Sequence, residues 1–374
     1  MQIVMCARCR AGFMMSPGVC PFCGSMQFFL AEMPTAPNPY AANPYAANPY
    51  ANAYANPYAN AYTNPYAAMQ NQAETNYQTG MNYLEGKNGV SKNEYTAVRY
   101  LTEAANAGHA KAQYKLGNCY RDGVGVIKNE YEAVNWYRKS AEQGCPEGQH
   151  NLGWCYAHGK GVTQNDYEAV KWYRKAAEQG DAKAQCNLGI FYSEGRGVTQ
   201  NYYEAVKWYR KAAEQGSANA QWNLGICYSY GKGVTQNYHE SMKWYRMAAE
   251  QGHARAQACL GCCYFEGWGC AQDLNAAIMW FRKALENSGD DREVRGSSYQ
   301  ALGKCYEEKY DYTTAVEYYE KAIREGINEA QYDYGKCWYY GRGVPKNRDL
   351  AKVFIESEAK KGYQPAIDFL KEHF

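Results

Sequence analysis

Apolar residues recur along most of this chain at the spacing of an amphipathic helix, and they do so in pairs of segments. In one unit the first segment carries apolar residues four apart, at Ala184, Leu188 and Tyr192. The second segment carries them three and four apart, at Ala205, Trp208 and Ala212. Residues at these separations share one face of an α-helix. The pattern therefore predicts two helices, each with one buried face.

Glycine and asparagine mark where these two helices end and begin. Gly195 and Gly197 break the first helix, and Asn201 is a residue type that caps the start of the second. Gly216 supplies the positive φ angle that favours a helix C-terminus. Gly189 lies inside the first helix, where glycine costs about 1 kcal/mol relative to alanine. We therefore expect a neighbouring helix to approach Gly189 closely.

The whole unit repeats with a period of 36 residues. Its Leu-Gly step returns at Leu116-Gly117, Leu152-Gly153, Leu188-Gly189, Leu224-Gly225 and Leu260-Gly261. A fixed period of this length predicts an array of stacked helical repeats instead of a globular enzyme fold. The spacing stretches to 42 residues between Gly261 and Gly303 and shrinks to 32 before Gly335. We count eight units over residues 75–363 and expect a capping helix over residues 364–374.

These residues resemble the Sel-1-like repeat, a relative of the tetratricopeptide repeat. The matching elements are the Leu-Gly-x-x-Tyr step, the Gly-x-Gly-Val loop at 195–198, and the second-helix pattern Ala-x-x-Trp-x-x-x-Ala-Ala-x-x-Gly. The resemblance covers about residues 75–363. It implies an all-α fold, a right-handed α/α superhelical solenoid that scaffolds protein complexes through its concave surface. The resemblance does not imply catalytic activity.

Some secreted, cysteine-rich bacterial members of this family are associated with penicillin binding and β-lactam hydrolysis. In these members a cysteine at the end of one second helix is stapled to another at the start of the next helix. This chain has Ala177 and Gln185 at one such pair of places, so the staple is missing. A Ser-x-x-Lys signature runs from Ser229 to Lys232, without the companion motifs of β-lactam-reactive enzymes. A hydrolase of this type is therefore an alternative that the sequence does not favour.

Four cysteines near the N-terminus form two Cys-x-x-Cys pairs separated by ten residues: Cys6, Cys9, Cys20 and Cys23. Four thiolates on two tight turns suit tetrahedral Zn²⁺. Pro21 and Gly24 shape the second turn, and the arrangement resembles a short zinc ribbon within residues 1–30. We expect one structural Zn²⁺ there. Iron, redox use and free thiols are the alternatives.

Six further cysteines share one repeat position, two residues after the repeated glycine: Cys119, Cys155, Cys227, Cys263, Cys305 and Cys337. Phe191 takes this position in another unit, which indicates that the position requires an apolar side chain. A buried free cysteine acts as a small apolar residue, so we predict that these thiols fill the core. The less favoured alternative is a second metal site, either at Cys259, Cys262, Cys263 and Cys270 or at Cys145, His150, Cys155 and His158.

Residues 31–74 repeat Asn-Pro-Tyr and contain no charge between 33 and 73. Because proline removes amide donors and disfavours a helix at the preceding residue, we predict a disordered linker. In the 374-residue chain, 40 basic residues balance 38 acidic ones, which argues against a nucleic-acid or membrane-surface partner. No apolar run approaches the length of a membrane span, and the first residues do not form a signal peptide. We therefore expect a cytoplasmic protein.

The first helix of each unit is expected to line the concave side of the solenoid. Side chains beside the Leu-Gly step, but off its buried stripe, would then face a partner: Lys111, Tyr114, Lys115, Asn151, Trp154, Lys183, Asn187, Trp222, Asn223 and Arg255. The asparagines form a ladder whose amides could hold an extended peptide, and the basic residues could contact carboxylates. The alternative for the ladder is hydrogen bonding within the repeat itself.

No acid, base and nucleophile stand together in this sequence. The carboxylates that recur on the second helices lie near lysines or arginines at helical spacing, as on a solvated surface. The sequence therefore favours a non-enzymatic adaptor that presents its concave surface to a protein or extended peptide of unknown identity. A secreted effector that scaffolds host proteins in the same way is a further alternative.

Overall fold

The computed structural model describes residues 3–6, 12–14, 28–30 and 65–374. They fall into two units, one within Met1–Thr63 and one comprising Asn64–Phe374. Each unit is described by itself.

The first unit contains a small antiparallel sheet. Its strands are β1 (Ile3–Cys6), β2 (Gly12–Met14) and β3 (Phe28–Leu30), in the order β2-β1-β3. Met5 pairs with Gly12 on one side of β1, and Cys6 pairs with Phe28 on the other. Cys6 thus ends the central strand. Cys9, Cys20 and Cys23 lie outside the described residues, so the zinc prediction stays a prediction.

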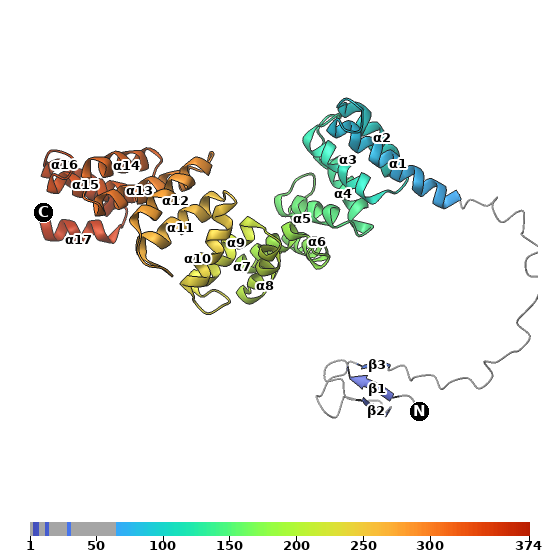
Figure 1. The fold of residues 1–374 in the computed structure, drawn as a ribbon, viewed down its shortest axis with the longest axis horizontal. Helices are drawn as coiled ribbons and strands as arrows, with labels where there is room; N and C mark the ends of the chain where they lie inside the picture. The colour runs from blue at the N-terminus through green and yellow to red at the C-terminus, as the bar shows by residue number, and fades with distance from the viewer. Residues whose placement is uncertain (1–2, 7–11, 15–27, 31–64) are drawn as a thin grey trace, which may run out of the picture. The chain divides into compact units, whose positions relative to one another are not determined.

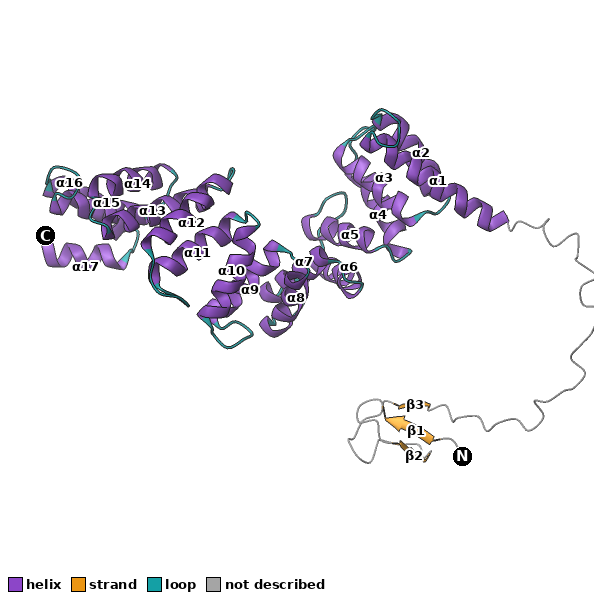
Figure 2. Ribbon diagram, in the orientation of Figure 1, coloured by secondary structure: helices purple, strands orange, loops and turns teal. Residues whose placement is uncertain are grey.

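The second unit is an array of α-helices, with no strand among residues 65–374 (Figures 1 and 2). Eight helix pairs are followed by a single last helix. The first helices of the pairs are α1 (Pro65–Glu85), α3 (Ala110–Asp122), α5 (Pro146–His158), α7 (Ala182–Glu194), α9 (Ala218–Tyr230), α11 (Ala254–Glu266), α13 (Arg292–Glu308) and α15 (Glu329–Tyr340). The second helices are α2 (Glu94–Asn106), α4 (Glu130–Glu142), α6 (Asp166–Glu178), α8 (Tyr202–Glu214), α10 (Tyr238–Glu250), α12 (Leu274–Asn287), α14 (Tyr312–Arg324) and α16 (Arg348–Lys360). Each pair is one repeat, numbered 1 to 8 in chain order.

The helix boundaries follow the signals of the sequence. Asn201 accepts a hydrogen bond from the backbone N–H of Glu204 at 3.1 Å and so caps the start of α8. Asparagine has the same role at the start of five other second helices: α2, α4, α6, α10 and α16. Gly195 ends α7 in the left-handed conformation with φ 72°, where a side chain would be strained. The predicted helix pairs and their loops are confirmed in the regular repeats.

The close approach predicted at Gly189 is also confirmed. A Cβ atom on Gly189 would lie 2.5 Å from the ring of Tyr209 and 3.2 Å from the carbonyl oxygen of Ala205, both in α8. The same contact between a first-helix glycine and a second-helix aromatic ring recurs at Gly117, Gly153, Gly225, Gly261 and Gly303. The glycine therefore lets the aromatic ring of the second helix pack directly against the backbone of the first helix.

The cysteines that follow these glycines are buried, as predicted. Cys119, Cys155, Cys227, Cys263, Cys305 and Cys337 are each at most 4% exposed, and Phe191 is 4% exposed in the same position. Burial raises the pKa of Cys227 to about 11 and that of Cys155 to about 12. These thiols therefore stay protonated in the folded array under ordinary conditions.

This burial predicts that the array loses stability in alkali. A thiol whose pKa is raised by folding stabilises the fold below its unfolded pKa of 9.0, and this contribution is lost as the pH rises toward about 11 or 12. Each such thiol changes the free energy of unfolding by about 1.4 kcal/mol per pH unit in that window. Urea denaturation at pH 8 to 10.5 should show a falling midpoint. Valine at Cys155 and Cys227 should make the fall shallower, and an equal slope in this variant would contradict the thiol account.

Neighbouring repeats are joined by a buried glutamine that the sequence did not reveal. Gln185 is 4% exposed; its amide donates to the carbonyl oxygen of Ala177 at 3.0 Å and accepts from Gln215 at 2.8 Å. One side chain thus connects the end of α6 with α7 and the end of α8. The same joint occurs at Gln113, Gln149, Gln221 and Gln257. The places where cysteine-rich relatives have a staple, Ala177 and Gln185, are here joined by a hydrogen bond.

The array departs from its period at both ends. Helix α1 begins at Pro65, so residues 65–74, which the sequence assigned to the linker, are helical. Pro65 is the last proline before a run of helix-forming residues, and proline is well accepted in a first helical turn. The spacing of 42 residues arises from the connection after α12 and from α13, which has 17 residues. The last helix is α17 (Gln364–His373), and it packs on α16.

Candidate partner-binding surface

First helices line the inner side of the array's curvature. In two places successive first helices touch one another, α3 with α5 and α11 with α13, as expected on the inner side of a curved stack. All ten side chains that the sequence assigned to a partner surface lie on these helices, in repeats 2 to 6. The name inner face is used below for this surface.

Three lysines of the inner face lack an acidic partner in an ion pair among the described residues. Lys111, Lys115 and Lys183 form no ion pair with any residue that the structure describes, although 23 ion pairs occur elsewhere in the described part of the chain. Lys111 and Lys183 are exposed, and the ammonium of Lys115 lies 5.6 Å from the ring centroid of Tyr114. Repeats 2 and 4 therefore present positive charges without an ion pair, in repeat 2 beside an aromatic ring, and this combination suits carboxylates on an otherwise apolar segment.

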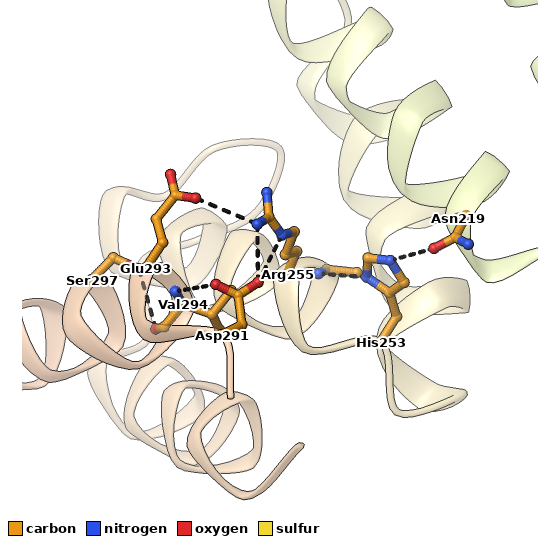
Figure 3. A network of polar contacts seen from close by, with 8 residues as sticks. Asn219, His253, Arg255, Asp291, Glu293, Val294 and Ser297 are labelled. Atoms are coloured by element: carbon orange, nitrogen blue, oxygen red, sulfur yellow. Dashed lines mark hydrogen bonds and ion pairs between the residues drawn. The ribbon is translucent and has the colours of Figure 1, made fainter. Parts of the chain in front are cut away.

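Arg255 is engaged within the chain and does not offer a free charge. Its guanidinium is 2.9 Å from a carboxylate oxygen of Asp291 and 3.4 Å from one of Glu293 (Figure 3). Asp291 caps the start of α13, so this network joins repeat 6 to repeat 7. In this structure the acids opposite Arg255 come from the N-cap and the first turn of α13, and its contact with a partner's carboxylate stays a prediction.

The asparagine ladder is engaged in hydrogen bonds between repeats. Asn151 donates to the side-chain oxygen of Asn118 at 3.0 Å, which also accepts from the hydroxyl of Tyr137. The amide of Asn187 lies 3.2 Å from Nε2 of His150. Burial lowers the pKa of His150, so its neutral ring can accept this bond. The geometry of these two asparagines matches the alternative in which the ladder holds the array together.

The two tryptophans of the inner face are partly buried and pack against histidines. The ring of Trp154 lies 4.5 Å from that of His158, and the ring of Trp222 lies 5.5 Å from that of His253. The indole nitrogen of Trp222 is buried without a hydrogen-bond partner among the described residues. Ile190 and Ile226, which the sequence did not single out, continue the apolar surface from Trp154 at the same repeat position.

The described residues do not bring together the groups that the less favoured predictions require. The hydroxyl of Ser229 is bonded to Ser241 at 2.6 Å and lies 3.2 Å from Tyr245, whereas Lys232 extends over the rings of Tyr202 and Tyr230. Ser229 and Lys232 thus have separate surroundings. Within residues 65–374, no three histidine, cysteine, aspartate or glutamate side chains are placed to hold a metal ion. None of the helices in that range is long and apolar enough to cross a bilayer.

Comparison with known proteins gives the repeats a family. The family model described as the Sel1 repeat matches eight consecutive segments, which follow the helix pairs of the structure. The matched segments are residues 73–109, 110–145, 146–181, 182–217, 218–253, 254–288, 298–327 and 328–363.

Two solved structures are similar over most of this chain. A protective antigen of uropathogenic Escherichia coli strains, which displays an SLR fold, is 33% identical, with 80% of this chain and 71% of that chain covered and a TM-score of 0.61. A Sel1 repeat protein from Oxalobacter formigenes is 32% identical, with 75% and 95% covered and a TM-score of 0.54.

Similarity to curated proteins is limited to one short stretch. The DAP3-binding cell death enhancer 1 of Rattus norvegicus is 47% identical over 45 residues, and that of Mus musculus is 49% identical over 43 residues. The aligned stretch covers 12% of this chain and only 8% of either relative. The binding described by their names concerns those proteins.

Proposed function

We propose, from the premise that this chain belongs to the Sel1 repeat family, that it is a non-enzymatic scaffold whose inner face holds an extended segment of a protein partner. The observation that carries the proposal is the free charge of repeats 2 to 4. Lys111, Lys115 and Lys183 are the basic side chains of the predicted surface without an ion pair, whereas Arg255 has one. We infer that the segment carries carboxylates opposite these lysines and apolar side chains opposite Trp154 and Ile190.

The rest of the inner face supports the same function by being rigid. Its asparagines and buried glutamines are bonded between repeats, so the surface is formed before a partner arrives. A preformed surface spends little free energy on ordering itself when it binds. Affinity is then determined by a few anchors, here the lysines and the rings next to them.

Reversing the three charges is expected to abolish partner capture. Lys111→Glu, Lys115→Glu and Lys183→Glu together should reduce the stoichiometric partner recovered with the tagged full-length chain at least tenfold, because each reversal replaces attraction to a carboxylate with repulsion. The matched control is Lys171→Glu, Lys207→Glu and Lys243→Glu, the same charge change on second helices. Equal loss of partner from both triple variants would contradict the proposal.

We also propose that Cys6, Cys9, Cys20 and Cys23 bind one structural Zn²⁺. The support is their spacing and the strand register: Cys6 ends β1 opposite Phe28, where the connection that contains Cys20 and Cys23 returns to the sheet. Sulfur ligands in this number suit zinc, which would supply folding energy to a small unit. The other three cysteines lie outside the residues whose structure is described.

Metal analysis of the full-length chain should give about one zinc per molecule. Cys20→Ser with Cys23→Ser should lower the zinc content to near zero while the helical circular dichroism signal of the array stays unchanged. Cys227→Ser with Cys155→Ser is the control, since these cysteines are core residues and should leave the zinc content intact. Zinc well below one per chain in the unaltered protein would contradict the proposal.

A further inference from the structure

An open cavity lies between repeats 4 and 5, where the inner face meets the glycine-rich loops. Its volume is about 410 Å³. Ser193 and Glu194, at the end of α7, form one wall, and Tyr202, at the start of α8, forms a second. Cys227 of α9 and Lys232 of the following loop also line the cavity. Because every wall belongs to the repeat pattern, the same place exists between other repeats and can be compared.

Between repeats 3 and 4 this place is filled by an arginine of the chain itself. The guanidinium of Arg196, the loop residue equivalent to Lys232, lies 2.9 and 3.1 Å from the carboxylate oxygens of Asp166. It is 3.5 Å from the carbonyl oxygen of Ala157, and it lies over the ring of Phe191 at 4.3 Å. Ala157, Asp166 and Phe191 occupy the repeat positions of Ser193, Tyr202 and Cys227. Arg196 thus contacts residues whose equivalents, one repeat later, line the open cavity.

Between repeats 7 and 8 a second arginine takes the equivalent place. Arg342 lies 3.2 Å from a carboxylate oxygen of Glu307, and its guanidinium is 5.3 Å from the ring centroid of Tyr312 and 4.8 Å from that of Tyr340. Glu307 and Tyr312 are the equivalents of Ser193 and Tyr202. Two unrelated sets of wall residues therefore accommodate the same group: a guanidinium held by one carboxylate and a ring.

The cavity is open where the loop residue is lysine. Lys232 lines the cavity without an ion pair to a described residue, and its ammonium lies 5.5 Å from the ring centroid of Tyr202 and 5.6 Å from that of Tyr230. Between repeats 2 and 3 the loop residue is Lys160, and a cavity of about 310 Å³ remains. Arg121, Lys128 and Lys160 outnumber Asp122 and Glu130 around that second cavity, so it does not favour a further cation.

We propose that the cavity between repeats 4 and 5 is a binding site for an arginine side chain of a partner. Glu194 supplies the carboxylate: its side chain is 51% exposed, and its one ion pair among described residues is a contact of 3.6 Å with Arg196. Tyr202 supplies the ring, and the Ser193 hydroxyl lies on the same wall. This site adds an arginine to the partner segment proposed above, beyond the stretch that faces the lysines of repeats 2 to 4.

The test uses a small probe and needs no partner, so this inference and the scaffold function can fail separately. The probe is Nα-acetyl-arginine methylamide, added to the full-length chain with labelled isoleucine methyl groups. Ile226 lines the cavity, and Ile190 occupies the same repeat position beside the place that Arg196 fills. We expect saturable shifts of the Ile226 methyl signals in the millimolar range, the affinity expected of one side chain, and no saturable shift at Ile190.

Two variants and one analogue complete the experiment. Glu194→Gln should weaken binding of the probe at least fivefold. Substitution of Glu178, an exposed residue of α6, by glutamine should leave the affinity for the probe unchanged. The citrulline analogue has the same shape without the charge and should bind at least fivefold more weakly. The proposal is overturned if no saturable shift occurs at Ile226 or if Ile190 responds equally. It is also overturned if the unaltered chain binds the citrulline analogue as tightly as the arginine probe, or if the Glu194→Gln variant binds the arginine probe as tightly as the unaltered chain does.

Discussion

Replacing Gly189 with leucine is expected to destabilise the array by more than 4 kcal/mol, the largest effect of any single substitution in a regular repeat. A Cβ alone would lie 2.5 Å from the ring of Tyr209, whose side chain is 2% exposed and fixed between α7 and α8. Because the ring is enclosed, neither helix can yield without opening the core of repeat 4. Overpacking by a few atoms typically costs about 1–3 kcal/mol, and leucine adds four carbons at this point.

Urea denaturation followed by circular dichroism measures this effect. Gly189→Leu should split the transition or lower its midpoint strongly, whereas Gly189→Ala should cost about 1–3 kcal/mol. Lys183→Leu is the matched control, because it places the same side chain on an exposed position of α7 and should change the stability by less than about 0.5 kcal/mol. A loss below 1 kcal/mol for Gly189→Leu would mean that the two helices do not pack as closely as described.

Gln185→Leu is expected to cost about 1–3 kcal/mol although leucine is the more apolar residue. The substitution removes the side-chain donor to the carbonyl oxygen of Ala177, which keeps the backbone N–H of Gly180 at 3.1 Å, and it removes the acceptor of the Gln215 amide at 2.8 Å. The loss of two hydrogen bonds between repeats outweighs the gain from burying an apolar side chain of similar size. The joint between repeats 3 and 4 should therefore weaken more than either repeat does internally.

Hydrogen exchange locates this loss. In Gln185→Leu the amides at the end of α6 and the start of α7 should exchange faster than those in the middle of α8. Gln164→Leu is the control, since Gln164 is exposed in a loop and forms no side-chain hydrogen bond with a described residue. If Gln185→Leu leaves the free energy of unfolding unchanged, the hydrogen bonds of Gln185 do not stabilise the contact between repeats. The same conclusion would then apply to the other four glutamines.

Much of the fold could be predicted because one local sequence pattern recurs over eight repeats. The Leu-Gly step with its following cysteine or phenylalanine indicated both a close helix contact and an apolar core, and Gly189, Tyr209 and Cys227 have these roles. Asparagine before six of the eight second helices marks their start for the same reason. Periodicity makes such signals reliable, since a coincidence would not recur at a constant spacing.

The roles of polar side chains were harder to predict, because they depend on partners from other helices. Gln185 was noticed only as a position without cysteine, yet it bonds to Ala177 eight residues away and to Gln215 thirty residues away. The position of Arg255 beside the Leu-Gly step predicts a partner contact, whereas the acids that it meets, Asp291 and Glu293, come from the N-cap and first turn of α13. The lysines of repeats 2 to 4 form no ion pair with a described residue, and their contact with a partner stays a prediction.

Site-directed photocrosslinking tests the central claim, that the inner face holds a protein segment, most directly. A photoreactive phenylalanine is placed at Asn219, an exposed inner-face position of α9, or at Glu214, an exposed position at the end of α8. In cells that normally produce the protein, full-length chain with the probe at 219 should give a discrete adduct with one protein, and the probe at 214 should not. The adduct should disappear when Lys111, Lys115 and Lys183 are changed to glutamate. The same adducts from both positions, or an adduct only from 214, would contradict the account.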